Sequence, residues 1–117
     1  MGVRIQTFFK HLQSFNNQVT TDKQRVQQIV LSLVKNALKY TETGFIRIKV
    51  KPYFDFDIKR WRLKIQVRDT GTGIKKADVL KLFKIFGTAD QPQNSHSGIG
   101  LGLVICKYIV QQFDGEI

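Results

Sequence analysis

Several residue types are scarce in this sequence of 117 residues, which contains one cysteine, two prolines, one methionine and one tryptophan. Because Cys106 has no second cysteine to pair with, an internal disulfide is excluded and a reducing compartment is favoured. No run of about 18 apolar residues occurs, and the N-terminus does not resemble a secretory signal. We therefore expect a cytoplasmic domain that is not inserted in a membrane, whether or not its parent protein is attached to one.

The two commonest nucleotide-binding loops are missing as well. The sequence contains no G-x-x-x-x-G-K-[ST], and Leu103 stands where a G-x-G-x-x-G fingerprint needs its third glycine. Two other glycine clusters are present, at Asp69–Ile74 and at Ser97–Leu103. The second opens into an apolar run typical of a helix, whose unpaired N–H groups and partial positive charge favour phosphate. The alternative for either cluster is a turn followed by a helix cap.

Composition indicates a single domain over residues 1–117, since 42% apolar residues with nine Phe can bury a modest core. The buried set is expected to include the thiol of Cys106. The formal net charge is +10, but Lys and Arg are scattered along alternating segments rather than clustered. This distribution argues against nucleic acid as a partner and favours phosphorylated ligands or an acidic protein partner.

A long amphipathic helix is predicted at about residues 22 to 40, because apolar residues recur there every three or four positions. Thr21 and Gln24 fit a capping box at its start. Ser32, Asn36 and Lys39 fall near one another along one side of this helix, at the border of the apolar stripe. Polar side chains at such a border are either solvated or directed at a ligand.

Alternation of apolar and basic residues predicts strands at 45–51 and 61–68, and a short alternating run at 3–9 is compatible with another. The linker between the two longer strands is too long for a two-residue turn, but its aromatic residues can extend both strands into a ribbon. Asp69 follows the second strand directly and precedes two glycines. A carboxylate at this position is well placed to face a pocket.

Two further helices are predicted, at about residues 76 to 84 and 101 to 113. The polar segment 87–97 between them lacks periodicity and lies between two candidate ligand-binding elements, which is the usual position of a lid.

Four motifs in this chain resemble those of the ATP-binding catalytic domain of sensor and hybrid histidine kinases. This domain belongs to a superfamily with the gyrase B subunit, heat-shock chaperone ATPases and mismatch-repair ATPases. The motifs are the asparagine box Gln28–Thr41, the first glycine box Asp69–Ile74, the phenylalanine box Phe83–Phe86 and the second glycine box Gly98–Leu103. They occur in the order and with the spacing of that family.

The resemblance implies an α+β fold. We expect a two-layer α/β sandwich in which a mixed, mainly antiparallel sheet is covered on one face by the three predicted helices. Members of the family continue with further strands after the position of Ile117, so the resemblance also implies that C-terminal strands are missing and that the chain is truncated at this end.

The resemblance also implies which residues bind adenine. Asp69 resembles the carboxylate that accepts a hydrogen bond from the adenine amino group, and it would repel the carbonyl of guanine. Gly71 and Gly73 would let the backbone approach the base. The candidates for the apolar and stacking walls are Tyr40, Ile74 and Phe86.

The implied phosphate site combines a metal ligand, a cation and backbone donors. Asn36 resembles the Mg²⁺ ligand of the family, with phosphate oxygens and waters completing the coordination. Lys39 would contact phosphate oxygens, and we expect Asn36 and Lys39 to be the catalytic residues. Main-chain N–H groups would reach the triphosphate from Gly98, Gly100, Leu101 and Gly102.

Two features limit the activity that the resemblance implies. Ser32 occupies a position where many histidine kinases have asparagine and the hydrolytic relatives have a glutamate base, so fast ATP hydrolysis is disfavoured. Neither His11 nor His96 resembles the phosphoacceptor histidine of the family. We therefore expect the γ-phosphoryl group to go to a histidine on a dimerisation segment that is absent from this chain.

The hypothesis from the sequence is a Mg-ATP-binding histidine kinase catalytic domain in two-component signal transduction. Its response-regulator receiver would be an indirect partner, and the piece is expected to be monomeric and not competent alone. The alternative is a nucleotide-binding regulatory module without kinase output. A stand-alone ATPase is disfavoured by Ser32.

Overall fold

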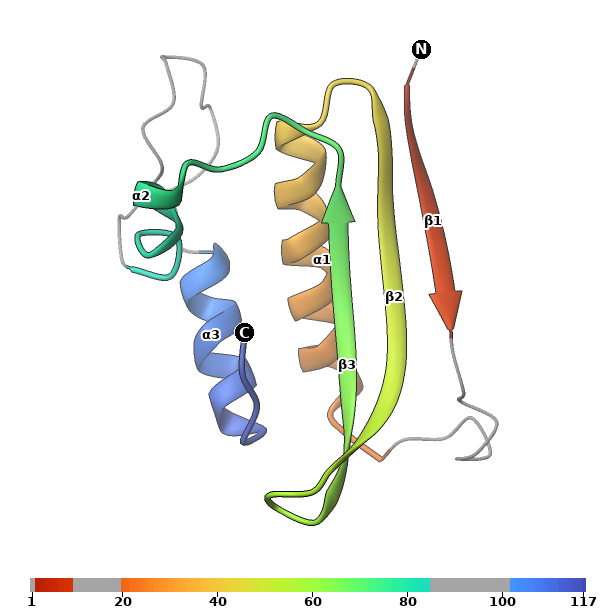
Figure 1. Cartoon of the computed structure of the whole chain (residues 1–117), viewed down its shortest axis with the longest axis vertical. Helices are drawn as coiled ribbons and strands as arrows, with labels where there is room; N and C mark the ends of the chain where they lie inside the picture. Colours follow the sequence, from red (N-terminus) through yellow and green to blue (C-terminus); the bar gives the residue numbers. More distant parts are fainter. Residues whose placement is uncertain (1, 10–19, 85–101) are drawn as a thin grey trace. The chain divides into compact units, whose positions relative to one another are not determined.

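The computed structural model describes residues 2–9, 20–84 and 102–117. The elements in chain order are β1 (Val3–Phe9), α1 (Lys23–Tyr40), β2 (Gly44–Asp55), β3 (Arg60–Asp69), α2 (Lys76–Val79) and α3 (Gly102–Gln112), as Figure 1 shows. They form an α+β fold with a mixed three-stranded sheet, which confirms the expected class. The chain divides into two compact units: a sheet unit, within residues 1–22 and 34–71, and a helical unit, within 23–33 and 72–117.

In the sheet unit, the strands are ordered β1-β2-β3. The pair β2–β3 is antiparallel from Ile46↔Asp69 to Asp55↔Arg60, whereas β1 and β2 run parallel. The alternation predicted from the sequence places Ile46 on one face, and its side chain is completely buried. The three predicted strands are therefore confirmed, with β2 and β3 longer than the alternating runs alone.

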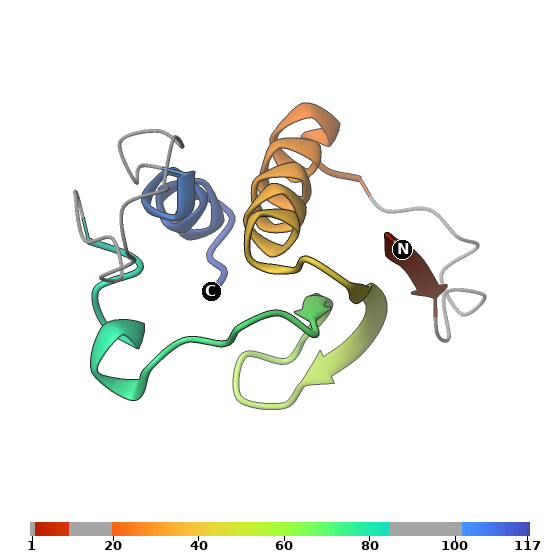
Figure 2. The same ribbon diagram turned by 90° about the horizontal axis from the view of Figure 1, so that it is seen from above.

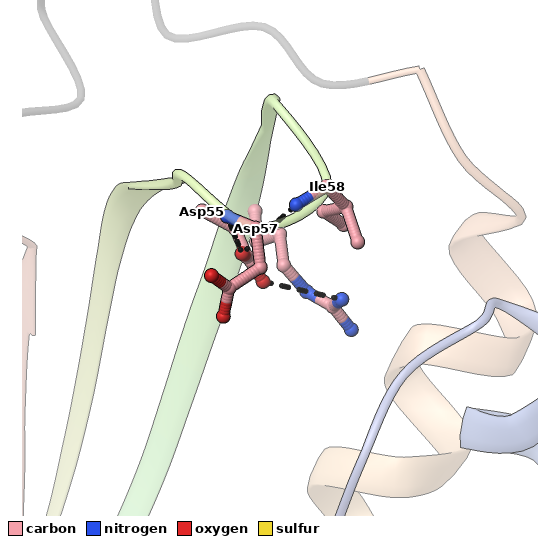
Figure 3. A network of polar contacts seen from close by, with 4 residues as sticks. Asp55, Asp57 and Ile58 are labelled. Atoms are coloured by element: carbon pink, nitrogen blue, oxygen red, sulfur yellow. Dashed lines mark hydrogen bonds and ion pairs between the residues drawn. The ribbon is translucent and has the colours of Figure 1, made fainter.

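The hairpin between β2 and β3 closes through a four-residue turn, Phe56–Lys59. Figure 3 shows how Asp55 organises it: its Oδ1 accepts hydrogen bonds from the backbone N–H groups of Asp57 and Ile58, at 3.1 and 3.4 Å. Its Oδ2 lies 3.6 Å from Nη1 of Arg62 on β3. One carboxylate thus caps the turn and links its two strands, which is a common role of Asp in turns.

Aromatic side chains extend the ribbon toward this turn, as the linker composition predicted. Phe54 lies opposite Trp61 in the register, and their ring centroids are 5.5 Å apart in an edge-to-face arrangement. Such pairs across a hairpin stabilise it beyond simple burial of apolar area.

In the helical unit, the first half of α1 contacts α3. The thiol of Cys106 is completely buried and lies 3.9 Å from the carbonyl oxygen of Ile29, and Val104 is also buried. The expectation that Cys106 is a core residue is confirmed. The helix itself begins at Lys23, one residue later than predicted, so that Asp22 and not Thr21 directly precedes it.

The second helix is shorter than predicted. α2 ends at Val79, and residues 80–83 continue as turns closed by hydrogen bonds three residues apart, such as Lys81 N–H to Asp78 O at 3.0 Å. Short helices depend on burial of an apolar face. Val79 and Leu80 remain 46% and 78% exposed, so the predicted apolar stripe here gains little from burial.

Candidate functional site

The last turns of α1 carry three of the predicted site residues. Asn36, Lys39 and Tyr40 are three and four positions apart, so they share one side of the helix. Asn36 is half-buried and Lys39 is exposed, with its Nζ 4.9 Å from the centroid of the Tyr40 ring. The amide, the ammonium group and the ring therefore form one continuous strip at the end of the helix.

The first glycine cluster begins where β3 ends, in the same unit. Asp69 is the last residue of β3 and is exposed, and its Oδ1 accepts the backbone N–H of Gly71 at 2.9 Å. This local hydrogen bond fixes the orientation of the carboxylate. Within the described residues the carboxylate of Asp69 has no other hydrogen bond or ion pair, so its second oxygen remains available to a ligand.

Gly71 brings the Asp69 turn against the C-terminal end of α1. A Cβ at this position would overlap with the carbonyl oxygen of Tyr40 and would lie 2.9 Å from Oγ1 of Thr41. Backbone atoms cannot move aside as a flexible side chain can, so only glycine fits. This contact joins the predicted adenine-binding carboxylate to the helix end that carries Asn36, Lys39 and Tyr40.

Two threonines that support this arrangement were not among the predicted site residues. The hydroxyl of Thr70 accepts the N–H of Phe45 at 3.0 Å and donates to the Phe45 carbonyl at 3.4 Å, which fixes the turn to the start of β2. Thr41 is 3% exposed, and its Oγ1 has no hydrogen-bond partner among the described residues. The sequence signal that could have identified these two threonines is a hydroxyl residue inside a glycine box or at the end of the predicted helix.

The helical unit carries the other predicted residues that the structure describes. Gly73 has a positive φ of 75°, Ile74 is 47% exposed, and Gly102 is the first residue of α3. No atom of the described residues lies within 4 Å of the position of a Cβ at Gly73 or Gly102. The predicted site residues outside the described ranges are Phe86, Gly98, Gly100 and Leu101. The predicted lid at 87–97 and both histidines also lie outside them.

Ser32 lies within the helical unit and interacts with Cys106. Burial raises the pKa of the Cys106 thiol, against a smaller opposite effect of its hydrogen bond with Ser32. The Ser32 hydroxyl is therefore engaged with a core cysteine. A hydroxyl in this setting is not a base for activating water.

The described residues contain no group of three or more His, Cys, Asp or Glu side chains that could hold a metal ion. None of the described helices combines the length and the apolar character needed to span a bilayer.

Comparison with known proteins identifies the family. Residues 21–117 match the model of the "Histidine kinase-, DNA gyrase B-, and HSP90-like ATPase" family. The chain belongs to this family. It is 42% identical over 100 residues to the signal transduction histidine-protein kinase BarA of Escherichia coli (strain K12), covering 85% of this chain and 11% of BarA.

Other relatives in the family are also sensor kinases. The chain is 39% identical over 97 residues to the sensor histidine kinase RcsC of Escherichia coli (strain K12), covering 82% of this chain and 10% of RcsC. A solved structure, full-length ShkA in complex with AMPPNP, resembles the chain with a TM-score of 0.66 and 26% identity, over 94% of this chain and 20% of ShkA. The chain thus spans about a tenth of the length of the curated relatives.

Proposed function

We propose that this chain is the Mg-ATP-binding catalytic domain of a sensor histidine kinase, which donates the γ-phosphoryl group of ATP to a histidine on a dimerisation segment of the parent protein. The observation that carries the proposal is the packing of Gly71 on the carbonyl of Tyr40. It holds the free oxygen of Asp69 and the strip Asn36–Tyr40 in one compact unit. Membership of the ATPase family and the AMPPNP bound by ShkA support the same choice of ligand.

In this proposal Asp69 selects adenine. Its Oδ1 is held by the N–H of Gly71, so Oδ2 accepts the hydrogen bond from the exocyclic amino group of the base. Guanine presents a carbonyl oxygen at that position, which a carboxylate repels. The exposed Ile74 and the Tyr40 ring are candidates for apolar contact with the base.

Asn36 and Lys39 would act on the triphosphate. A single half-buried amide with no carboxylate cluster among the described residues fits a Mg²⁺ ion that is held mainly by phosphate oxygens and water. The ion supplies charge neutralisation during phosphoryl transfer. Lys39, exposed beside the Tyr40 ring, adds a positive charge that can reach the phosphates, and the N-terminus of α3 adds backbone donors.

The Ser32–Cys106 interaction favours phosphoryl transfer to a protein over hydrolysis. A water-activating base is needed for rapid hydrolysis, and Ser32 does not provide one. The bound ATP would therefore persist until the acceptor histidine of the parent kinase is presented. A response-regulator receiver then takes the phosphoryl group in the next step of a two-component system.

Calorimetric titration with a non-hydrolysable ATP analogue tests the nucleotide site. We expect Asp69→Asn to lower affinity about tenfold with and without Mg²⁺, because the amide cannot accept the amino group as a carboxylate does. Asn36→Ala should remove mainly the part of the affinity that depends on Mg²⁺. Asp57→Asn, an identical chemical change in the β2–β3 turn, is the matched control and should leave the affinity unchanged.

The proposed phosphoryl transfer to histidine needs a separate measurement. Adding the dimerisation segment of the parent protein with radioactive ATP should yield an acid-labile phosphate on that segment, and Asn36→Ala should abolish it. Nucleotide binding without any transfer would instead favour the regulatory module without kinase output. Steady-state phosphate release that depends on Asn36 would favour a stand-alone ATPase.

A further inference from the structure

One face of the sheet concentrates positive charge. Side chains alternate between the two faces of a strand, so the register assigns seven cations of β2 and β3 to the face opposite the buried Ile46, of which Arg60 and Arg62 lie at the hairpin end beside Asp55. We call the other five the basic face: Arg47, Lys49, Lys51, Lys64 and Arg68. All five belong to the sheet unit, and neither the predicted site nor the proposed phosphoryl transfer uses them.

Two pairs of like charges lie directly opposite each other on the basic face. Arg47 is the register partner of Arg68, and Lys51 is the register partner of Lys64. Opposed side chains in an antiparallel pair are neighbours, so like charges at these positions destabilise the sheet. A local arrangement that costs stability without compensation inside the fold is typical of a functional surface.

The described strands offer almost no compensating negative charge on this face. Asp55 is their one carboxylate here, and it lies at the hairpin end, where it forms its ion pair with Arg62. Lys49, Lys51, Lys64 and Arg68 have no ion pair with any described residue. Their charges are therefore available to an external partner.

The side chain of Arg47 is held on the sheet by aromatic contacts. Its guanidinium carbon lies 4.8 Å from the ring centroid of Phe45 and 5.3 Å from that of Phe8. Its Nη2 donates to Oε1 of Gln6 at 3.3 Å, while its buried Nε has no partner among the described residues. This arrangement fixes a positive charge at the sheet surface beside Arg68 without a neutralising carboxylate.

We propose that the basic face binds an acidic segment of a partner protein in extended conformation. Alternate residues of an extended chain are about 7 Å apart, which is also the repeat of Lys49 and Lys51 along β2. Carboxylates at that repeat would lie over the cations and relieve the repulsion between the opposed pairs. The proposal is independent of nucleotide binding.

The composition of the basic face favours a polypeptide over other polyanions. The guanidinium of Arg47 lies over the rings of Phe8 and Phe45, so one face of each ring is already occupied and is not available for stacking of a nucleobase. The two most exposed apolar side chains of the hairpin, which a membrane would take up first, lie elsewhere: Phe56, 81% exposed, is in the turn, and Trp61, 58% exposed, is on the opposite face. On the side of the basic face, Phe8 and Tyr53 are 42% and 39% exposed.

The test measures binding of a fluorescent peptide of alternating Glu and Thr, by anisotropy, with the whole chain. We expect Lys51→Glu to weaken binding about tenfold, and to raise the melting temperature by about 3 °C, because it converts the repulsive pair with Lys64 into an attractive one. Lys107→Glu on α3, exposed and in the helical unit, makes the same change in net charge. It should alter affinity by less than about twofold.

A double variant separates binding from stability. Lys51→Glu with Lys64→Glu again places like charges opposite each other, so the melting temperature should return toward that of the natural sequence while affinity falls further. Equal losses for Lys51→Glu and Lys107→Glu would overturn the proposal, since net charge alone would then explain binding.

Competition experiments with other ligands identify the class of partner that binds the basic face. An ATP analogue should not displace the peptide, and displacement would place the peptide at the nucleotide site and overturn the proposal. Tighter binding to a single-stranded oligonucleotide of equal charge, or to phosphatidylserine vesicles, would replace the acidic protein segment with nucleic acid or membrane and equally overturn it.

Discussion

Gly71 and Gly102, one from each predicted glycine cluster, lie in different surroundings within their own units. In the sheet unit Gly71 packs on the carbonyl of Tyr40, whereas Gly102 in the helical unit begins α3 with no atom of the described ranges within 4 Å of a Cβ position. Both are glycines in motifs predicted to contact ATP. Close packing within the protein explains the first by itself. The second has no requirement for glycine among the described residues, and in the proposed function it is the point at which ATP approaches the backbone.

This difference shows that one motif type has two physical uses. The sheet unit uses glycine to fix a carboxylate turn against a helix end, and Ile46, the register partner of Asp69, is completely buried in the same unit. The helical unit leaves Gly102 exposed at the start of α3. Substitutions should therefore affect stability in the sheet unit and ligand affinity at the start of α3.

The largest effect is expected at the core of the sheet unit. Ile46→Ala removes a completely buried side chain and should lower the free energy of unfolding by about 3 kcal/mol, measured by urea denaturation. Ile48→Ala, on the same face but half-buried, is the control and should cost less. Equal losses at the two positions would contradict the assignment of Ile46 as the centre of this core.

Gly71→Ala should have the next largest effect. The added methyl group meets backbone atoms of Tyr40, so we expect a loss of about 2 kcal/mol in stability together with weaker binding of the ATP analogue. Gly73→Ala meets no atoms but must adopt a φ of 75°, which costs about 1 kcal/mol. A Gly71→Ala variant as stable as the natural sequence would show that the turn does not rest on α1.

The pH dependence of stability tests whether the thiol of Cys106 is buried in the helical unit. Because burial raises its pKa, the folded state binds the proton more tightly than the unfolded chain. The contribution to stability is complete below the ordinary thiol pKa and is lost as the pH rises through the raised value. Alkylation should be several-fold slower than in urea-unfolded protein at the same pH. Equal rates in the two states would contradict burial of the thiol.

Thr70→Val should have a smaller effect. It removes both hydrogen bonds with Phe45 while preserving the shape of the side chain, which should cost about 1 kcal/mol. Thr70→Ser keeps the hydroxyl and should recover most of the loss. Thermal unfolding of the two variants measures this, and similar melting temperatures would show that the hydroxyl does not anchor the turn.

The smallest change in stability is expected at Gly102. Gly102→Ala places a better helix former in open space and should stabilise the fold by about 0.5 kcal/mol. Calorimetry with the ATP analogue should nevertheless show weaker binding, because the methyl group hinders approach to the backbone. Unchanged affinity would remove α3 from the proposed phosphate site and would weaken the comparison between the two clusters.

The local pattern of apolar residues predicted a helix or strand well where it repeated over many residues and where the element is substantially buried. The apolar repeat of α1 and the alternation of β2 and β3 gave the type of each element, and the aromatic linker indicated the long ribbon. The same reasoning made α2 too long, because periodicity does not show whether an apolar stripe such as Val79 and Leu80 is covered.

The residues of the candidate site also fall into those that the local sequence predicted and those that it did not. Motif order pointed to Asn36, Lys39 and Asp69 because each motif is local in sequence. It did not single out Thr41 and Thr70, whose roles depend on neighbours distant along the chain, such as the 25 positions that separate Thr70 from Phe45.

The sequence by itself determined the type of each helix and strand, the family that the motifs resemble and the candidate residues for ATP and Mg²⁺, because these depend on short-range spacing. Only the tertiary structure decided that Gly71 must be glycine, that Ser32 is engaged with Cys106, and that like charges face each other across β2 and β3. The physical reason is that contact, burial and strand register arise from pairing of distant segments, and the order of residues along one segment does not specify them.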